Sequence, residues 1–159
     1  MKLQVGVPDG RAGPHVFVVD LDTPEINDRD RHHLSRVLRI ADGDPLTVCD
    51  GSGRWRSCRF GASLVPTGDV VEVSAPEVEI AVGFSLIKSG RPDLVVQKLT
   101  ELGVDRIVPL IASRSVVHWT LEKEHDHLAR FQRVSREASM QSRRVRLPVI
   151  SALTGVEAV

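Results

Sequence analysis

The chain has little of several residue types that mark particular protein classes. It contains no tyrosine, two tryptophans and two cysteines, and aromatic residues make up 4% of it. No uncharged run approaches the ~20 residues that a membrane-spanning helix needs, and the first residues do not resemble a secretion signal. Cys49 and Cys58 are therefore expected to be reduced thiols rather than a disulfide. We expect a cytoplasmic protein without a membrane partner.

Motifs for phosphate loops, metals and nucleophilic catalysis are also missing from the sequence. Gly51 and Gly53 belong to a turn, and neither a Walker-type nor a dinucleotide-type glycine spacing occurs. His125 and His127 are two residues apart, which does not place them on one helical face, and no cysteine or carboxylate cluster completes a metal site. No serine lies in a nucleophile-elbow pattern. The sequence thus argues against kinases, dehydrogenases, hydrolases and metal enzymes.

Arginine is what the chain has in abundance. The 159 residues are 42% hydrophobic, which is enough to build the core of one ordinary domain or two small ones. The net charge is zero, but 17 arginines stand against 4 lysines and gather in residues 31–59 and 130–146. A guanidinium group binds phosphate bidentately and stacks on bases, as nucleic-acid binding requires. A codon bias of a high-GC genome explains the same composition equally well, and both interpretations stay open.

The first 74 residues have the pattern of short strands separated by turns. Strands are predicted over residues 15–19, 45–50, 54–60 and 70–74, and the turn Asp50-Gly51-Ser52-Gly53 predicts a hairpin between the second and third. This pattern favours a small β-barrel or β-meander.

One helix is predicted among these strands, over residues 31–40. Leu34, Val37 and Leu38 recur at helical spacing and form an apolar stripe. A different, cationic face is expected to carry His32, Arg36 and Arg39. We expect His32 to point outward and its neighbour His33 to be partly buried.

After Pro76 the pattern changes to strands that alternate with helices. Strands are predicted over residues 78–87, 106–111 and 147–150, and helices over 92–102 and 124–142. The first strand is nearly continuous in apolar residues, as expected of a strand covered on both sides. The order predicts a parallel sheet with right-handed crossovers, the first half of a doubly wound α/β domain. The chain stops at Val159 within the expected first turns of another helix, so we expect the domain to be unfinished.

Three strings of the sequence match one family in the right order. His32-His33-Leu34-Ser35-Arg36-Val37-Leu38-Arg39, with Gly43-Asp44 and Asp50-Gly51 after it, resembles the N-terminal PUA-like domain of RsmE-type 16S rRNA uridine methyltransferases. The string Gln97-Lys98-Leu99-Thr100-Glu101-Leu102-Gly103-Val104, leading into Ile107-Val108-Pro109-Leu110, resembles the start of their catalytic domain. Glu137-Ala138, Gln141-Ser142, Arg144 and Leu147-Pro148 resemble the segment after its second helix. The chain is therefore similar to this family over residues 31–148.

The resemblance implies an α+β protein of two domains. Residues 1–74 would form a PUA-like β-barrel that binds RNA, and residues 75–159 the N-terminal part of a truncated α/β domain of the SPOUT class. Members of this class bind S-adenosylmethionine in a C-terminal knot, pair as homodimers through it, and make N3-methyluridine in the 16S rRNA of the small subunit. The donor-binding motifs are expected beyond Val159, so this chain alone should be inactive.

The resemblance and the positive charge together suggest an RNA-binding set, while no catalytic residue can be named. The target uridine would leave its stack, and the barrel would grip the surrounding RNA by shape and backbone. Arginines at the sheet's carboxyl edge would stabilise the uridylate charge or hold flanking phosphates. The candidates are His32, Arg36, Arg39, Arg54, Arg56, Arg114, Gln141 and Arg144. The sequence departs from the family at Arg143, where a small residue is expected, and in having no tyrosine, which leaves Trp55, Trp119, histidine or arginine for base stacking.

Two other functions stay open. A noncatalytic RNA-binding module would keep the PUA-like domain and use half of the α/β domain as an assembly surface. A small α/β enzyme unrelated to RNA would show no salt-sensitive RNA affinity and an activity independent of the methyl donor. A glycine-rich, knot-like continuation after Val159 would favour the methyltransferase over the module.

Overall fold

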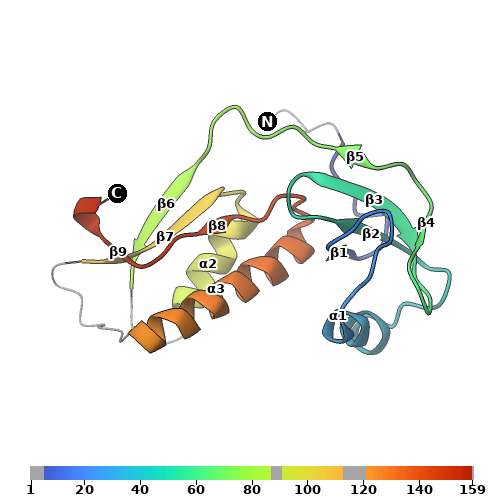
Figure 1. Cartoon of the computed structure of the whole chain (residues 1–159), viewed down its shortest axis with the longest axis horizontal. Helices are drawn as coiled ribbons and strands as arrows, with labels where there is room; N and C mark the ends of the chain where they lie inside the picture. Colours follow the sequence, from blue (N-terminus) through green and yellow to red (C-terminus); the bar gives the residue numbers. More distant parts are fainter. Residues whose placement is uncertain (1–5, 87–90, 113–120, 159) are drawn as a thin grey trace. The chain divides into compact units, whose positions relative to one another are not determined.

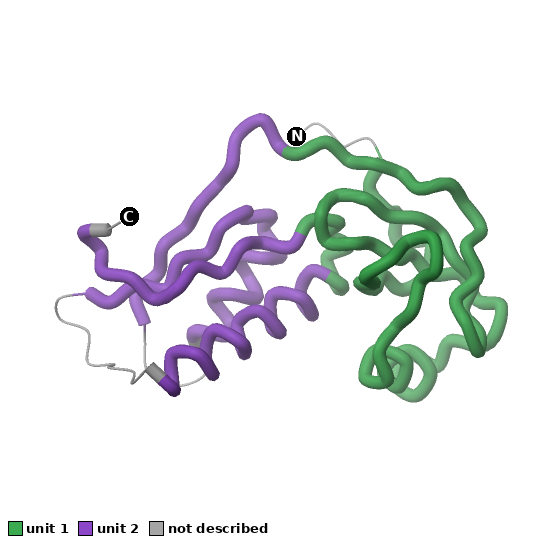
Figure 2. Tube along the Cα trace, viewed as in Figure 1, with its two compact units in different colours: residues 1–75, 140–146 green, residues 76–139, 147–159 purple. Residues whose placement is uncertain are grey.

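The computed structural model describes residues 6–86, 91–112 and 121–158. The chain divides into two compact units, which Figures 1 and 2 show. Unit 1 holds residues 1–75 and 140–146, and unit 2 holds residues 76–139 and 147–159. The chain therefore leaves unit 1 after Ala75 and returns to it for one short segment, which begins in the last turn of helix α3 (Leu121–Ser142).

Unit 1 is built on a five-stranded sheet. Its strands are β1 (His15–Phe17), β2 (Pro45–Cys49), β3 (Arg54–Arg59), β4 (Val65–Pro66) and β5 (Val71–Glu72). β1 lies parallel to β2, β3 lies antiparallel to β2, and β3 pairs with β4 near one end and with β5 near the other. The predicted hairpin joins β2 to β3, where Gly51 and Gly53 have φ angles of 76° and 108° that glycine adopts without a Cβ clash.

The sheet of unit 1 is open. Among the described residues β1 pairs only with β2, while β4 and β5 pair only with β3. A closed barrel needs a continuous ladder between its first and last strands. β4 and β5 are two residues long, too short to provide one. The expected PUA-like region is thus present as a meander with a parallel first strand, without the closed barrel that the sequence suggested.

The helix of unit 1 begins earlier than predicted and changes its winding. Helix α1 runs over Asp28–His32, and the side chain of Asn27 caps it by accepting the N–H of Asp30 at 2.8 Å. A π-helical turn, η1 (His33–Val37), continues it. Arg39 follows with a φ of 54°, in the left-handed region. The prediction that Arg39 belongs to a regular helix was therefore wrong.

The π-helical turn also changes which side chains are buried. A π turn holds more residues than an α turn, so a stripe at α-helical spacing does not stay on one face. Leu34 is fully buried, but Val37 is 60% exposed and Leu38 44% exposed. His32 is exposed and His33 is half-buried, which confirms the expected order of the two histidines.

The sheet of unit 1 separates two apolar clusters. Side-chain alternation along β1 and β2 places Val16 and Val48 in one cluster and Phe17 in the other. Cys58 belongs to the first cluster and Cys49 to the second, and both are buried thiols that form no disulfide. Because the clusters lie on opposite sides of the strands, the two cysteines are not placed to form a disulfide. This agrees with the reduced thiols that the sequence predicted.

Unit 2 is a parallel sheet with two crossover helices. It comprises β6 (Ala81–Ser85), α2 (Arg91–Glu101), β7 (Arg106–Ile111), α3, β8 (Val149–Ile150), β9 (Thr154–Gly155) and a 3-10 turn, η2 (Val156–Ala158). β7 pairs in parallel with β6 on one side and with β8 and β9 on the other, so β8 and β9 act as one interrupted strand. This confirms the predicted parallel order of the sheet.

Both helices of unit 2 cover the same face of its sheet (Figure 1). Right-handed crossovers that advance in one direction across a sheet place their helices on one side. Val96, Ile107 and Phe131 are fully buried between that face and the helices. Gly103, with a φ of 90°, ends α2 and donates its N–H to the carbonyl of Thr100 at 3.0 Å.

The other face of this sheet is uncovered in the described part of the chain. Burial alternates along β6: Val82 and Phe84 are half-buried, whereas Ala81 and Ser85 are exposed. Val78, which precedes the strand, is 73% exposed. The expectation of a strand buried on both sides was therefore wrong for β6, because apolar composition does not reveal how many layers pack on a sheet.

In the segments that the structure describes, no helix is long and apolar enough to cross a membrane.

Candidate nucleic-acid interface

Three of the predicted RNA-binding residues lie on or just after the helix of unit 1. His32 ends α1, Arg36 lies in η1 and Arg39 follows it. All three are exposed, and none of their side chains bonds to another described residue. The guanidinium groups of Arg36 and Arg39 and the imidazole of His32 can therefore reach a phosphate without breaking a side-chain contact within the described part of the protein.

Two further candidates lie on β3 and are already engaged. Arg54 forms an ion pair with Asp50, at 2.8 Å between Nε and Oδ2. Burial of Asp50 opposes its ionisation, but hydrogen bonds from Ser52 and Arg54 outweigh this and lower the pKa of the carboxyl group. Arg56 donates Nη2 to the carbonyl of Gly68 at 2.7 Å and Nη1 to another backbone carbonyl. Arg56 thus cross-links the loops of unit 1.

The remaining candidates come from the second arginine cluster and the sheet edge. Gln141 is exposed in the last turn of α3, and Arg144 follows in the segment that returns to unit 1. Arg114 lies outside the described residues. The structure thus brings Gln141 into the same unit as His32, Arg36 and Arg39, although more than 100 residues separate them in the sequence.

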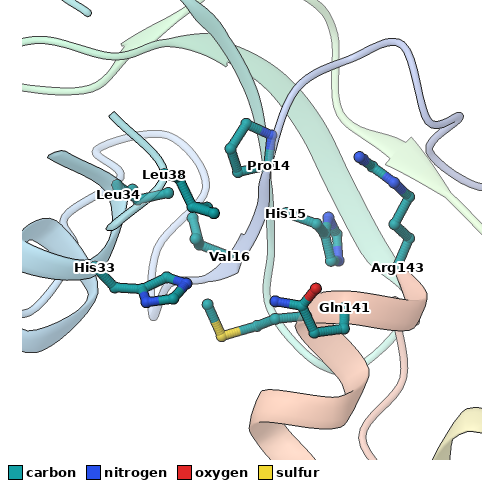
Figure 3. A pocket seen from close by; sticks show the side chains of 9 residues that line it. Pro14, His15, Val16, His33, Leu34, Leu38, Gln141 and Arg143 are labelled. Carbon is teal, nitrogen blue, oxygen red and sulfur yellow. The ribbon is translucent and has the colours of Figure 1, made fainter. Parts of the chain in front are cut away.

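A pocket lies where the helix of unit 1, strand β1 and the returning segment meet (Figure 3). Its volume is about 230 Å³. Three segments line it: residues 14–16, then His33, Leu34 and Leu38, and finally Met140, Gln141 and Arg143. In Figure 3, His33 and Gln141 point toward the space beneath Val16 and His15. The lining combines apolar side chains with a few polar groups, as ligand pockets do.

His15 forms the buried wall of this pocket. Its Nδ1 lies 2.8 Å from Thr47 Oγ1, and its Nε2 lies 3.0 Å from Cys49 Sγ and 3.3 Å from the carbonyl oxygen of Arg144. Burial, helped by the nearby positive charge of Arg143, lowers the pKa of His15 to about 4. The imidazole is therefore neutral at physiological pH, and both ring nitrogens are occupied.

Arg143 has the most unusual backbone in the pocket. Its φ is 57°, a conformation in which a side chain is strained and small residues are favoured. Its Nη2 donates to the carbonyl of Gly13 at 2.6 Å, whereas its buried Nη1 has no partner in the described part of the chain. Sequence reasoning listed neither Arg143 nor His15 as a site residue. The sequence did mark Arg143 as unusual, because the family is expected to have a small residue at this position.

Two family models match parts of the chain. A model described as an RNA methyltransferase PUA domain matches residues 26–62. A model described as an RNA methyltransferase domain matches residues 74–159, more than half of the chain. Among curated relatives, the ribosomal RNA small subunit methyltransferase E of Mycobacterium bovis is 32% identical over 126 residues, which are 76% of this chain and 48% of that protein. The Synechocystis protein of the same name is 32% identical over 127 residues, 76% of this chain and 40% of that one.

The chain belongs to the RsmE-type family of small-subunit rRNA methyltransferases. It spans about half the length of the curated RsmE relatives it matches. An RsmE structure from Neisseria gonorrhoeae, bound to S-adenosyl methionine, is 25% identical and superimposes with a TM-score of 0.71 over 89% of this chain and 62% of that one. A Legionella pneumophila protein solved with bound SAM shares the fold, with a TM-score of 0.75, 23% identity and coverage of 91% and 64%.

The described residues do not by themselves fit the methyl donor that those two solved structures hold. Ligands of such sheets bind beyond the carboxyl ends of the strands. Here Leu86, Ala112 and Val156 continue the three strand lines, and their side chains are apolar. They offer no acceptor for ribose hydroxyls or the adenine amino group. Residues 87–90 and 113–120 of that edge lie outside the described part, so we assign unit 2 no step in methyl transfer.

Proposed function

We propose that the complete protein methylates N3 of a uridine in 16S rRNA, using S-adenosylmethionine as the donor. The domain division suggested by the sequence is kept in this proposal: residues 1–74 bind RNA, and residues 75–159 form the first part of the methyltransferase domain. The donor site is expected in the part of the relatives' length that this chain does not span. The partner is the small ribosomal subunit, the location is the cytoplasm, and the complete protein acts as a homodimer.

One observation carries the RNA part of the proposal. The segment that matches the PUA model presents Arg36 and Arg39 as exposed cations without a described partner, in a chain whose net charge is zero. Other arginines of the chain are already neutralised: Arg106 pairs with Glu79, and Arg130 pairs with Asp93. Available positive charge is what binds an RNA backbone, because it displaces condensed counterions from phosphates.

The structure also ranks the remaining RNA-binding candidates within the proposal. Arg54 is exposed and could exchange its ion pair with Asp50 for a phosphate, whereas Arg56 would have to give up hydrogen bonds that hold unit 1 together. His32, Gln141 and Arg144 remain proposed contacts, because they belong to the same unit as Arg36 and Arg39. Arg114 stays a proposal that the described residues do not address.

The proposed grip on RNA is tested by the salt dependence of binding. In fluorescence anisotropy with a 16S rRNA transcript, Arg36→Ala combined with Arg39→Ala should lower the slope of log K against log salt by about two phosphate contacts, roughly 1.4–1.8. The matched control, Arg106→Ala with Arg130→Ala, removes the same net charge from arginines that carboxylates already neutralise. Its slope should stay close to that of the unmodified chain. Equal slopes for both double variants would remove Arg36 and Arg39 from the interface.

The proposed chemistry is tested separately by donor binding. Calorimetric titration of S-adenosylmethionine should show binding by a longer protein that spans the full length of the RsmE relatives and none by the 159-residue chain. Methylation of small subunits by the longer protein should then appear as N3-methyluridine in digested 16S rRNA. Donor binding by the 159-residue chain, or methylation at another uridine atom, would contradict this part of the proposal.

A further inference from the structure

The pocket of unit 1 has polar groups that the folded chain leaves unused. Arg143 lines it, but its Nη1, which has no described partner, is buried and is not accessible to a ligand in the open part of the pocket. The side chains of His33 and Gln141 also line the pocket, and neither bonds to another described residue. His15 differs from them, because both of its ring nitrogens are engaged and the residue is only 3% exposed. These unused hydrogen-bonding groups favour a ligand with at least one acceptor atom.

The walls and the size of the pocket narrow the class of ligand. Pro14, Leu38 and Met140 provide apolar surface, with Leu38 44% exposed, whereas the lining residues Val16 and Leu34 are fully buried. The volume of about 230 Å³ lies below the ~300–1,000 Å³ of pockets that enclose drug-sized molecules. A flat ring system of the size of one base suits this space. A second molecule that reacts with it does not, so the pocket is a recognition site and not a place of methyl transfer.

The backbone that forms the pocket is held in unfavourable conformations on two sides. Arg39 and Arg143 are the non-glycine residues with positive φ in the described part of the chain. Arg143 lines the pocket itself, and Arg39 directly follows the lining residue Leu38. The π-helical turn supplies His33 and Leu34. π turns and strained residues are concentrated at functional sites, where they place side chains that a regular helix could not.

We propose that this pocket holds one unstacked nucleobase of the bound RNA. A ring carbonyl oxygen of the base accepts a hydrogen bond from the Gln141 amide, and the face of the base stacks on the His33 ring. Arg36 and Arg39, in the same segment as His33 and Leu38, hold the neighbouring phosphates. The inference rests on the proposed function, because it takes RNA as the ligand, and it adds base recognition to a grip that would otherwise involve only the backbone.

The test compares two oligomers of equal charge, hexauridylate and the abasic ribose-phosphate hexamer, in anisotropy titrations with the intact chain. Stacking on a protein platform is worth ~1–3 kcal/mol per base, so His33→Ala should weaken binding of hexauridylate about fivefold or more and leave the abasic oligomer unchanged within twofold. The matched control is His32→Ala, which removes the neighbouring exposed histidine that does not line the pocket. It should not change the ratio of the two affinities.

A second variant keeps the test decisive if His33→Ala unfolds, which circular dichroism reveals. Gln141→Ala changes an exposed residue at a helix end, where alanine is tolerated, and should lower the affinity for hexauridylate alone. Unmodified chain that binds both oligomers with equal, salt-dependent affinity would overturn the base pocket and leave the RNA-binding proposal standing. Absence of binding to either oligomer and to the 16S transcript would overturn both. An equal change in the ratio of the two affinities in His33→Ala and His32→Ala would also reject the pocket.

Discussion

His15 should make the stability of unit 1 depend on pH. An unfolded chain protonates this histidine near pH 6.5, whereas the folded protein, which buries it, protonates it only near pH 4. Between these values the unfolded state binds more protons than the folded state. The contribution of His15 to the free energy of unfolding is therefore fully present above about pH 6.5 and falls as the pH decreases toward 4. At 1.36 kcal/mol per pH unit the complete loss is about 3 kcal/mol, of which roughly 2 kcal/mol is reached at pH 5.

Urea unfolding at pH 7.5 and pH 5 measures this contribution. Trp55 packs against the second apolar cluster of unit 1, and a Trp119→Phe background makes it the sole fluorescent tryptophan. In His15→Phe the drop in unfolding free energy between the two pH values should be smaller by roughly 2 kcal/mol than in the background chain. His32→Phe, which removes an exposed histidine, should keep the full drop. Equal drops in His15→Phe and the background chain would refute the argument that burial keeps His15 neutral.

Two further predictions concern the packing of unit 1. Gly13 and Gly43 both have positive φ, but a Cβ at Gly13 would lie 1.8 Å from the carbonyl oxygen of Pro45, whereas a Cβ at Gly43 meets nothing within 4 Å. In thermal unfolding, Gly43→Ala should therefore lower the free energy of unfolding by about 1–2 kcal/mol and Gly13→Ala by clearly more. Similar losses in the two variants would contradict the close approach at Gly13. Cys49 and Cys58 are buried, and burial raises the pKa of the Cys58 thiol to about 11, so mass spectrometry should find neither thiol alkylated by iodoacetamide at pH 8 until urea unfolds the chain; rapid labelling of native protein would contradict this.

The sequence predicted the order of elements well because that order depends on local patterns. The turn Asp50-Gly51-Ser52-Gly53 encodes a hairpin, since positive φ angles at its glycines are a local requirement, and the structure has it. The alternation of apolar strands and amphipathic helices after Pro76 predicted a parallel sheet, because parallel neighbours need long crossovers. The three matching strings likewise indicated the family, since they are short, contiguous and in the right order.

The number of layers packed on the sheet of unit 2 and the winding of the helix in unit 1 could not be predicted from local patterns. Strand β6 is apolar enough to be covered on both faces, yet its helices lie on one. The segment after Asp28 has α-helical periodicity, but packing of Leu34 into the core of unit 1 accompanies a π turn that leaves Val37 exposed. These features depend on what else packs against a segment, and periodicity within the segment carries no record of that.

By itself, the sequence determined the kinds of elements, their order and the exposed cations Arg36 and Arg39, because each follows from neighbouring residues. Only the tertiary structure decided that residues 140–146 return to unit 1 and that His15 meets the carbonyl of Arg144, 129 residues away. It also decided that Arg143 adopts a positive φ beside a pocket. The physical reason is that burial and hydrogen bonding between distant segments are properties of the folded chain, and these determine the pKa of His15 and the contacts of Arg143.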